Sequence, residues 1–485
     1  MTISSALGNA NSGLTVAAKR ANVISNNVAN ALTPGFSRRE ISVGENVIAG
    51  KGAGVTVNGV SRAENQALTN DRRTAEAVSN RDQEVAATYA KFNAALGEPD
   101  DPYSLFGQYQ NLESSLRSLA LTPESIPVQT QVLDAAKSLA TRFNQLAAQT
   151  QTIRGEADGK IARNVDVLNA NLAQIEKLNN QISRGSATGR DITGLQDQRK
   201  ILIDEVSSSI PIREIARGTG KIDLMTKEGV FLLAGKARQV EFTHANTVTA
   251  ASSLAGGQLS GLSVEGIDIT PGTSASFSVA QGGIAGLFQV RDQVAPDFQD
   301  KMDALASDVI QRFENADPTL VAGAPGLFTD NGAAFDPTAQ AGLAGRITIN
   351  ASVDPGQGGD LWRLRDGVGA ATEGATGNAD LIFMLLDGLA TLQPPPAGSG
   401  LSSQGTAIDA IANITSIIGS ARVSSESRLA SSSASSQALR DVETQTTAVD
   451  TDFELQQLLI VEQAFAANAR VIQAAGQMID RLMEL

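Results

Sequence analysis

The residues of this chain that could carry chemistry are few and scattered. His244 is the only histidine and cysteine is absent, so a catalytic triad or a thiolate metal site has no set of residues from which to form. His244 itself is expected at a strand end or turn, facing solvent. The acids Asp366, Glu373 and Asp380 could act as a carboxylate pair, but no pattern brings them together. A solvated acidic surface is the expected role for all three.

Two short motifs have the composition of ligand sites without the spacing. Gly218-Thr219-Gly220-Lys221 is similar to the end of a phosphate-binding loop, but Ile215 stands where that loop requires its upstream glycine. Asp330-Asn331-Gly332 lacks the ligand spacing of a calcium loop. We therefore expect no catalytic residues, no cofactor, no metal and no enzymatic activity.

Composition and charge exclude further classes. The 485 residues are enough for two to four domains, and 42% are hydrophobic, so the chain can bury cores. The net charge of −14 argues against a nucleic-acid partner, because no basic stretch offsets it. No apolar run reaches the ~18 residues of a membrane span, so no membrane partner is expected. Residues 1–14 lack the features of a secretory signal.

The clearest pattern lies in residues 449–485, where apolar residues recur in alternating steps of three and four. These steps place one stripe along a helix of about 55 Å, which is typical of a coiled-coil seam. A stripe of this length needs a partner helix. Its two series are Leu458, Phe465, Ile472 and Ile479, and Val461, Asn468, Ala475 and Leu482.

The first residues of the chain supply a matching helix. Thr33-Pro34-Gly35 is its stop signal, because the residue before proline leaves the helical region. Its polar residues are mostly uncharged asparagines, which can be buried against other chains if their amides find partners. Ordinary amphipathic helices in a globular bundle are the alternative. The seam runs Ile3, Leu7, Ala10, Leu14, Ala17, Ala21, Ile24, Val28 and Ala31.

Three stretches resemble one family. Residues 24–38 (ISNNVANALTPGFSR) are similar to the N-terminal signature of bacterial flagellar rod, hook and hook-associated proteins, and residues 462–472 (EQAFAANARVI) to their C-terminal signature. Residues 195–205 (LQDQRKILIDE) resemble the helix before the inserted domain of the hook-associated members. The terminal motifs are specific for these axial proteins but cover a small part of the chain. The family often has Tyr at Phe36 and Phe465, so a hydroxyl is missing here.

The resemblance implies a structural subunit that polymerises at the hook–filament junction and joins hook to filament through its paired terminal helices. It assigns assembly roles to two sets of residues. The N-terminal set is Ile3, Leu7, Leu14, Ile24, Asn26, Asn27, Val28, Asn30, Pro34, Gly35 and Phe36. The C-terminal set is Leu458, Val461, Phe465, Asn468, Ile472, Ile479 and Leu482.

The resemblance also implies partners and a location. The partners would be copies of the chain in a homo-oligomeric ring, the hook protein, the second junction protein on the filament side, and an export chaperone on the C-terminal helix. The location would be the extracellular flagellum, reached by type III export without a cleaved signal peptide. Another axial protein, such as a hook or distal rod protein, is the main alternative. A secreted enzyme or adhesin on a flagellar stem, and a cytosolic coiled-coil scaffold, are others.

The middle of the chain predicts a nested arrangement. Helical composition over residues 61–209 and 286–439 indicates an inner bundle, and Thr122 is a candidate N-cap of its longest helix. Gly155 and Gly159 either bend that helix or divide it in two. Short alternating runs over residues 210–285 predict an antiparallel β-domain.

The predicted fold is therefore mainly α. It is an elongated, nested coiled-coil bundle formed by the N- and C-terminal regions, with an inserted β-domain. Three domains are expected: a terminal helical polymerisation domain, a helical bundle domain and the β-rich insertion. They comprise residues 1–60 with 440–485, residues 61–209 with 286–439, and residues 210–285.

Overall fold

The computed structural model describes residues 3–48 and 51–483, so the last two residues of the predicted C-terminal helix lie outside the described residues. Contacts within the chain divide it into two compact units. The first comprises Met1–Ala77, Val167–Val240 and Ser432–Leu485, and the second comprises Val78–Asp166 and Glu241–Ser431. Residues 210–285 contribute strands to both units, and the three-domain division stays a prediction.

The chain is dominated by helices, and its strands form small sheets of two to four strands. The α-helices are α1 (Ile3–Ala29), α2 (Gln66–Leu96), α3 (Leu105–Leu121), α4 (Ile126–Ala187), α5 (Thr193–Ser209), α6 (Gly283–Gln289), α7 (Ala295–Ala316), α8 (Arg363–Asp366), α9 (Asp380–Ala390), α10 (Ala407–Thr447) and α11 (Thr451–Met483). The strands are β1 (Arg39–Ile48), β2 (Lys51–Arg62), β3 (Ile212–Ala216), β4 (Ile222–Thr226), β5 (Phe231–Ala234), β6 (Lys236–Ala237), β7 (Val240–Glu241), β8 (Ser263–Val264), β9 (Ile267–Asp268), β10 (Phe328–Asp330) and β11 (Ile347–Ile349).

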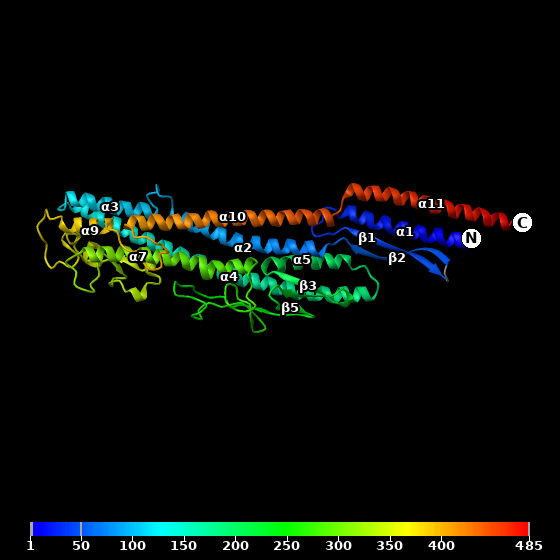
Figure 1. The fold of residues 1–485 in the computed structure, drawn as a ribbon, viewed down its shortest axis with the longest axis horizontal. Helices are drawn as coiled ribbons and strands as arrows, with labels where there is room; N and C mark the ends of the chain where they lie inside the picture. The colour runs from blue at the N-terminus through cyan, green and yellow to red at the C-terminus, as the bar shows by residue number, and fades with distance from the viewer. Residues whose placement is uncertain (1–2, 49–50, 484–485) are drawn as a thin grey trace. The chain divides into compact units, whose positions relative to one another are not determined.

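The first unit contains the two terminal helices and a long hairpin. Figure 1 shows α1 lying between α11 and the antiparallel pair β1–β2, with α1 and α11 running in opposite directions. Apolar contact between the helices is centred on Ala17, Ile24 and Val461, which are all buried. Small side chains such as Ala17 allow the helix axes to approach closely.

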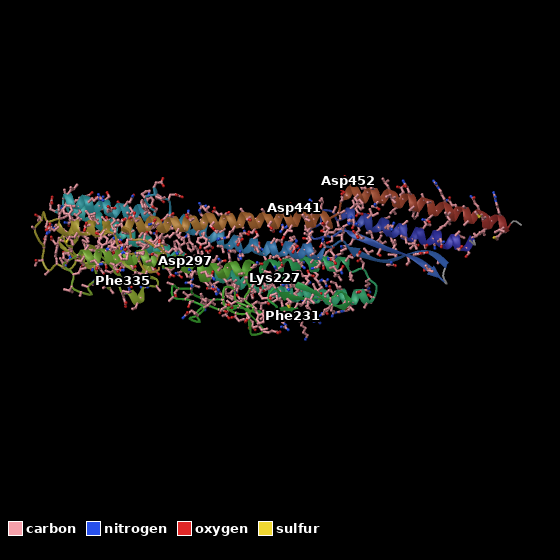
Figure 2. All side chains as sticks on the ribbon, in the orientation of Figure 1. Lys227, Phe231, Asp297, Phe335, Asp441 and Asp452 are labelled. Atoms are coloured by element: carbon pink, nitrogen blue, oxygen red, sulfur yellow. The ribbon has the colours of Figure 1, made fainter. Side chains whose placement is uncertain are left out.

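The same unit holds a four-stranded antiparallel sheet in the order β3-β4-β5-β6. Leu224, Leu232 and Leu233 of this sheet are buried. Asn179 of α4 holds β4 in place, since its Nδ2 donates to the carbonyl oxygen of Ile222 at 2.8 Å. Figure 2 shows Phe231 on strand β5 of this sheet.

The second unit is a helical bundle with loops and short hairpins. Its core includes the stacked rings of Phe92 and Phe298, whose centroids are 4.1 Å apart. A π-helical segment, Val290–Val294, joins α6 to α7. Two hairpins, β8–β9 and β10–β11, lie in the same unit.

Two polar side chains of α4 hold the irregular segments of the second unit. Arg154 donates to the carbonyl oxygens of Thr249 and Ser252 at 2.8 and 2.6 Å. Asp158 is fully buried and accepts from Arg291 Nη1 at 2.6 Å. His244 lies 2.6 Å from the other oxygen of Asp158, and its side chain is 48% exposed. The single histidine is thus half-exposed and bound to a structural carboxylate.

The predicted fold class is confirmed: long helices form bundles, and small antiparallel sheets occupy the inserted region. The question of one or two helices over residues 123–184 is also settled, because α4 is one helix of 62 residues. Gly155 and Gly159 lie inside it without a break. The prediction that Thr122 is the N-cap of α4 was wrong. Thr122 ends α3, and α4 begins at Ile126.

One expectation about the acids was wrong. Asp366 and Glu373 do come together, because Arg365 lies between them, with its Nη2 2.6 Å from Asp366 and 3.3 Å from Glu373. Both carboxylates therefore belong to an ion-pair cluster. Asp380 is the first residue of α9, and the ion pairs of Arg365 do not include it.

A glycine pair tests the packing of the second unit. A Cβ on Gly286 in α6 would lie 2.8 Å from the carbonyl oxygen of Arg81, whereas one on Gly155 in α4 would meet nothing within 4 Å. We expect Gly286→Ala to lower the free energy of unfolding by about 1–3 kcal/mol. The control Gly155→Ala should raise it by about 0.5–1 kcal/mol, since alanine favours helix. Urea unfolding of the full chain measures both, and equal stability of Gly286→Ala and wild type would contradict the packing described.

Candidate assembly interface

The helices α1 and α11 approach each other closely at one glycine. Gly13 faces Asn468, and a Cβ at Gly13 would lie 2.7 Å from Asn468 Oδ1. A larger residue at position 13 would require the Asn468 side chain to move. Asn468 Nδ2 donates to the carbonyl oxygen of Ala464 at 2.9 Å, so the amide donor is satisfied within its own helix. The polar member of the predicted seam is therefore accommodated beside the partner helix.

Asn27 is the central hydrogen-bonding residue of the first unit. Its Oδ1 accepts from Arg39 N at 2.8 Å, and its Nδ2 donates to Arg39 O at 3.0 Å and to Glu454 Oε1 at 3.0 Å. The side chain is buried and pairs with strand β1 as another strand would. One amide thus joins α1, β1 and α11, and leaves none of these polar groups without a partner.

The loop after α1 has a conformation that requires its glycine. Gly35 has a φ of 77°, and a Cβ there would lie 2.6 Å from Ile201 Cδ1 of α5. The Thr33 amide donates to Asn30 O at 2.9 Å, which closes the turn. Leu32, at the tip of this loop, is 96% exposed.

Ion pairs join the hairpin to α5. Asp197 accepts from Arg39 Nη2 at 2.5 Å and from Arg62 Nη1 at 3.1 Å, and all three side chains are largely buried. The Arg39 guanidinium also lies 4.5 Å from the centre of the Phe36 ring. A ring without a hydroxyl is sufficient for this cation–π contact.

A second buried network joins α2, α5 and α10. Arg72 pairs with Asp204 at 2.8 Å and with Glu443, and Arg73 pairs with Asp204 at 2.6 Å. Burial opposes ionisation of Asp204, but Arg73, Lys200 and Arg72 outweigh it and lower the pKa of this carboxyl. Removal of one partner would leave an uncompensated buried charge, so the network constrains the three helices.

The predicted assembly residues divide by exposure. On α1, Ile24 and Asn27 are buried, Ile3, Leu7, Leu14 and Val28 are half-buried, and Asn26 is exposed. In the loop after α1, Asn30 and Phe36 are half-buried, and Pro34 and Gly35 are exposed. On α11, Val461 is buried, Asn468 and Ile472 are half-buried, and Leu458, Phe465, Ile479 and Leu482 are exposed. The contact between α1 and α11 therefore covers only part of the predicted α11 stripe. The roles of these residues in assembly stay predictions.

Sequence reasoning missed a second apolar stripe on α11. We call it the outer stripe; its members are Phe453, Ile460, Ala464, Ala467, Val471, Ala474 and Met478, and all are exposed. From Ile460 onward they follow the same three–four alternation as the seam, offset by one residue, which turns the stripe by about 100° around the helix. Gln457 interrupts the alternation between Phe453 and Ile460. This offset repeat in the sequence of α11 could have revealed the outer stripe. In Figure 2, Asp452 marks the start of the helix that carries this stripe.

Metal clusters and membrane-spanning helices are not found in the described part of the chain. No group of three or more His, Cys, Asp or Glu residues within residues 3–48 and 51–483 could hold a metal ion. Among the helices of those residues, none is both long enough and apolar enough to cross a membrane.

Three family models match the chain. Residues 89–319 match the flagellar hook-associated protein FlgK helical domain. Residues 445–485 match the C-terminal model of the flagellar basal body rod FlgEFG proteins, and residues 7–36 match the flagella basal body rod protein model. The two terminal matches cover α11 and most of α1, which are the helices that pair.

Individual proteins similar to this chain are hook-associated or hook junction proteins. Flagellar hook-associated protein 1 of Bacillus subtilis is 24% identical over 499 residues, covering 94% of this chain and 93% of that protein. Its Salmonella typhimurium counterpart is 28% identical over 249 residues, covering 49% of this chain and 44% of that protein. The solved flagellar hook junction protein FlgK of Burkholderia pseudomallei matches 54% of this chain and 47% of its own, with 17% identity and a TM-score of 0.44.

Asn27 provides a test of the terminal pairing. In Asn27→Ala, the N–H and C=O of Arg39 lose their partners inside the protein, and the free energy of unfolding should fall by about 1–3 kcal/mol. Asn26→Ala is the matched control, because Asn26 is the neighbouring asparagine and is exposed. It should change stability by less than about 0.5 kcal/mol. Urea unfolding measures the difference, and equal losses in the two variants would contradict the role of Asn27.

Glu454 predicts a dependence of stability on pH. Burial raises the pKa of Glu454, and the bond from Asn27 and the charge of Arg38 offset this only in part. The native state therefore holds the proton to higher pH than the unfolded chain, whose glutamates titrate at about 4.3. Stability from this group is present at low pH and is lost as pH rises through the raised pKa.

The variant Glu454→Gln removes this titration and keeps an oxygen that can accept from Asn27. We expect its stability relative to wild type to increase as pH rises from about 4 to 7. Unfolding free energies measured across that range test the sign. A difference that stays constant or decreases would show that Glu454 does not titrate as described.

Proposed function

The chain belongs to the flagellar hook-associated protein 1 family, and from this premise we propose that it is a structural subunit of the hook–filament junction. Its terminal helices match the models of the axial rod proteins, and residues 89–319 match the helical domain specific to the hook-associated members. The latter match favours this member of the family over the alternative of a hook or distal rod protein.

The outer stripe is the observation that carries the mechanism. In a single chain α11 packs on α1 by one face only, and Ile460, Val471 and Met478 on the neighbouring face are about half exposed. An apolar stripe of this length is typical of a surface that is covered in an assembly. The occupant is the terminal helix pair of a second copy of this chain, so that copies form a ring.

The exposed face of α1, which carries several asparagines and one exposed lysine, Lys19, fits the same assembly. Asn11, Asn22 and Asn26 are exposed on this helix. Amides can form hydrogen bonds between subunits without the cost of burying a charge. Neighbouring α1 helices can therefore pack closely while their polar groups stay paired.

The flagellum supplies the remaining partners. The chain is a flagellar component and associates with other flagellar components. The hook protein on one side and the second junction protein on the filament side are the partners we propose for the ring. The exposed apolar surface of α11 also needs cover before assembly, which supports an export chaperone on this helix. Type III export without a cleaved signal would deliver the subunit to the extracellular flagellum.

A structural role without catalysis accounts for the features described. Asp158 and the Asp366–Glu373 pair are each bound by a buried arginine. Such pairs hold loops and helices in place and do not require a substrate. We therefore do not propose an enzymatic activity.

The outer stripe gives the test of this function. Val471→Asp places a charge in the stripe, where the wild-type side chain is 45% exposed. We expect the variant subunit to leave the monomer's melting temperature unchanged and to fail to complement a deletion strain. Electron microscopy should then show hooks without filaments.

Gln473→Asp is the control, because it adds the same charge at an exposed position on the polar side of α11. It should restore filaments and swimming. If Val471→Asp also restored both at normal levels, the outer stripe would not be an assembly surface. If the full deletion kept its filaments, the proposed junction function would be wrong.

A further inference from the structure

A basic cavity lies in the first unit, away from the outer stripe. Its volume is about 270 Å³, and it is bounded by α5, the end of β2, the start of α2 and the turn between β3 and β4. Six of the lining residues are basic and two, Glu64 and Glu214, are acidic. This excess of positive groups stands out in a chain whose net charge is −14.

Four of the six basic side chains have carboxylate partners. Such pairs satisfy the charge of a buried arginine or lysine without any ligand. The pairs are Arg62 with Asp197 and Glu64, Arg73 with Asp204 and Glu214, Lys200 with Asp204 and Glu443, and Arg217 with Asp223. These four groups do not by themselves indicate an anion site.

Arg199 is different. It is 8% exposed, and its Nη1 donates to Asn179 Oδ1 at 2.8 Å and to Gly220 O at 2.7 Å. Within the described residues, no carboxylate forms an ion pair with it. Burial lowers the pKa of Arg199, Glu214 opposes the change, and Arg62 lowers it further. The guanidinium is thus a buried cation held by neutral oxygens, with Nη2 and Nε left for another acceptor.

The second basic group without an ion-paired carboxylate among the described residues comes from the Gly218–Lys221 turn. Lys221 Nζ donates to Asn180 Oδ1 at 3.1 Å, and its side chain lines the same cavity. Thr219 and Gly220 of this turn have positive φ values of 65° and 75°. The turn therefore supplies Lys221 and the Gly220 carbonyl that accepts from Arg199, and both residues line the cavity.

We propose that this cavity binds a small multivalent oxyanion of the phosphate type, held by Arg199 and Lys221. A guanidinium and an ammonium are the groups that proteins use for such anions, and a buried guanidinium binds them by paired N–H donors. A cavity of this volume has room for more than one water molecule, which needs about 10–15 Å³. The anion supplies a direct ion-pair partner, which neither group has among the described residues.

Isothermal titration of the full-length monomer with inorganic phosphate tests the proposal, with ionic strength held constant by sodium chloride. Wild type should show saturable binding at one site per chain. Arg199→Gln should weaken this binding at least tenfold. Arg190→Gln is the matched control, because Arg190 is an exposed arginine of the same unit that does not line the cavity, and it should bind as wild type does.

Lys221→Gln is the second variant, because loss of Arg199 also removes bonds to Asn179 and Gly220 and could unfold the unit. Lys221 makes one bond to a side chain, and its replacement should still weaken phosphate binding at least tenfold while thermal unfolding stays cooperative. Absence of saturable binding to wild type overturns the proposal. So does binding of wild-type strength in folded forms of both cavity variants. Neither result tests the proposed hook–filament function, because filament formation in cells tests that function.

Discussion

The arrangement of the terminal helices depends on one buried amide. Asn27 satisfies the N–H and C=O of Arg39 and donates to Glu454, so the ends of two helices and a strand meet at a single side chain. A buried amide without partners is costly, and each of these three elements supplies a partner for it. Further along the same pair, Gly13 lies close to the Asn468 side chain. Together these two contacts hold the helices in place although their apolar contact is narrow.

The narrow apolar contact between α1 and α11 leaves apolar surface of α11 exposed. Because α1 and α11 meet through small residues such as Ala17 and Val461, the remaining apolar residues of α11 stay at the surface. The buried ion pairs around Asp197 and Asp204 hold the neighbouring hairpin and helices without using that surface. The fold thus separates the forces that build the subunit, which are largely polar at this end, from the apolar surface that we propose for joining subunits.

Periodicity predicted the helices well, because the three–four alternation is a local property of the sequence. It also identified both terminal helices as a pair. It did not show which α11 residues face α1, since the seam and the outer stripe have the same spacing and differ by one position. The alanines of the outer stripe, such as Ala464 and Ala467, also fit exposed helix surface equally well.

Interactions between distant residues lay beyond sequence reasoning. The partner of Arg199 or of Asp158 depends on segments brought together only by folding, so no local pattern shows which cation lacks a carboxylate. The unbroken α4 was ambiguous for a similar reason, because glycine lowers the helical propensity of a segment but neighbouring packing decides whether it breaks. Asp366 and Glu373 illustrate the opposite case, in which an arginine adjacent in the chain brings two acids together.

The bond between Asn27 and Glu454 spans 427 positions of the chain. During synthesis, α1 emerges from the ribosome long before its partner helix has been translated. Nothing of α11 exists at that time to cover the apolar side of α1, and closing so long a loop is among the slower events of folding. The two helices therefore cannot pair until nearly all of the intervening residues have been translated. The nascent chain lacks this helix pair during most of its elongation.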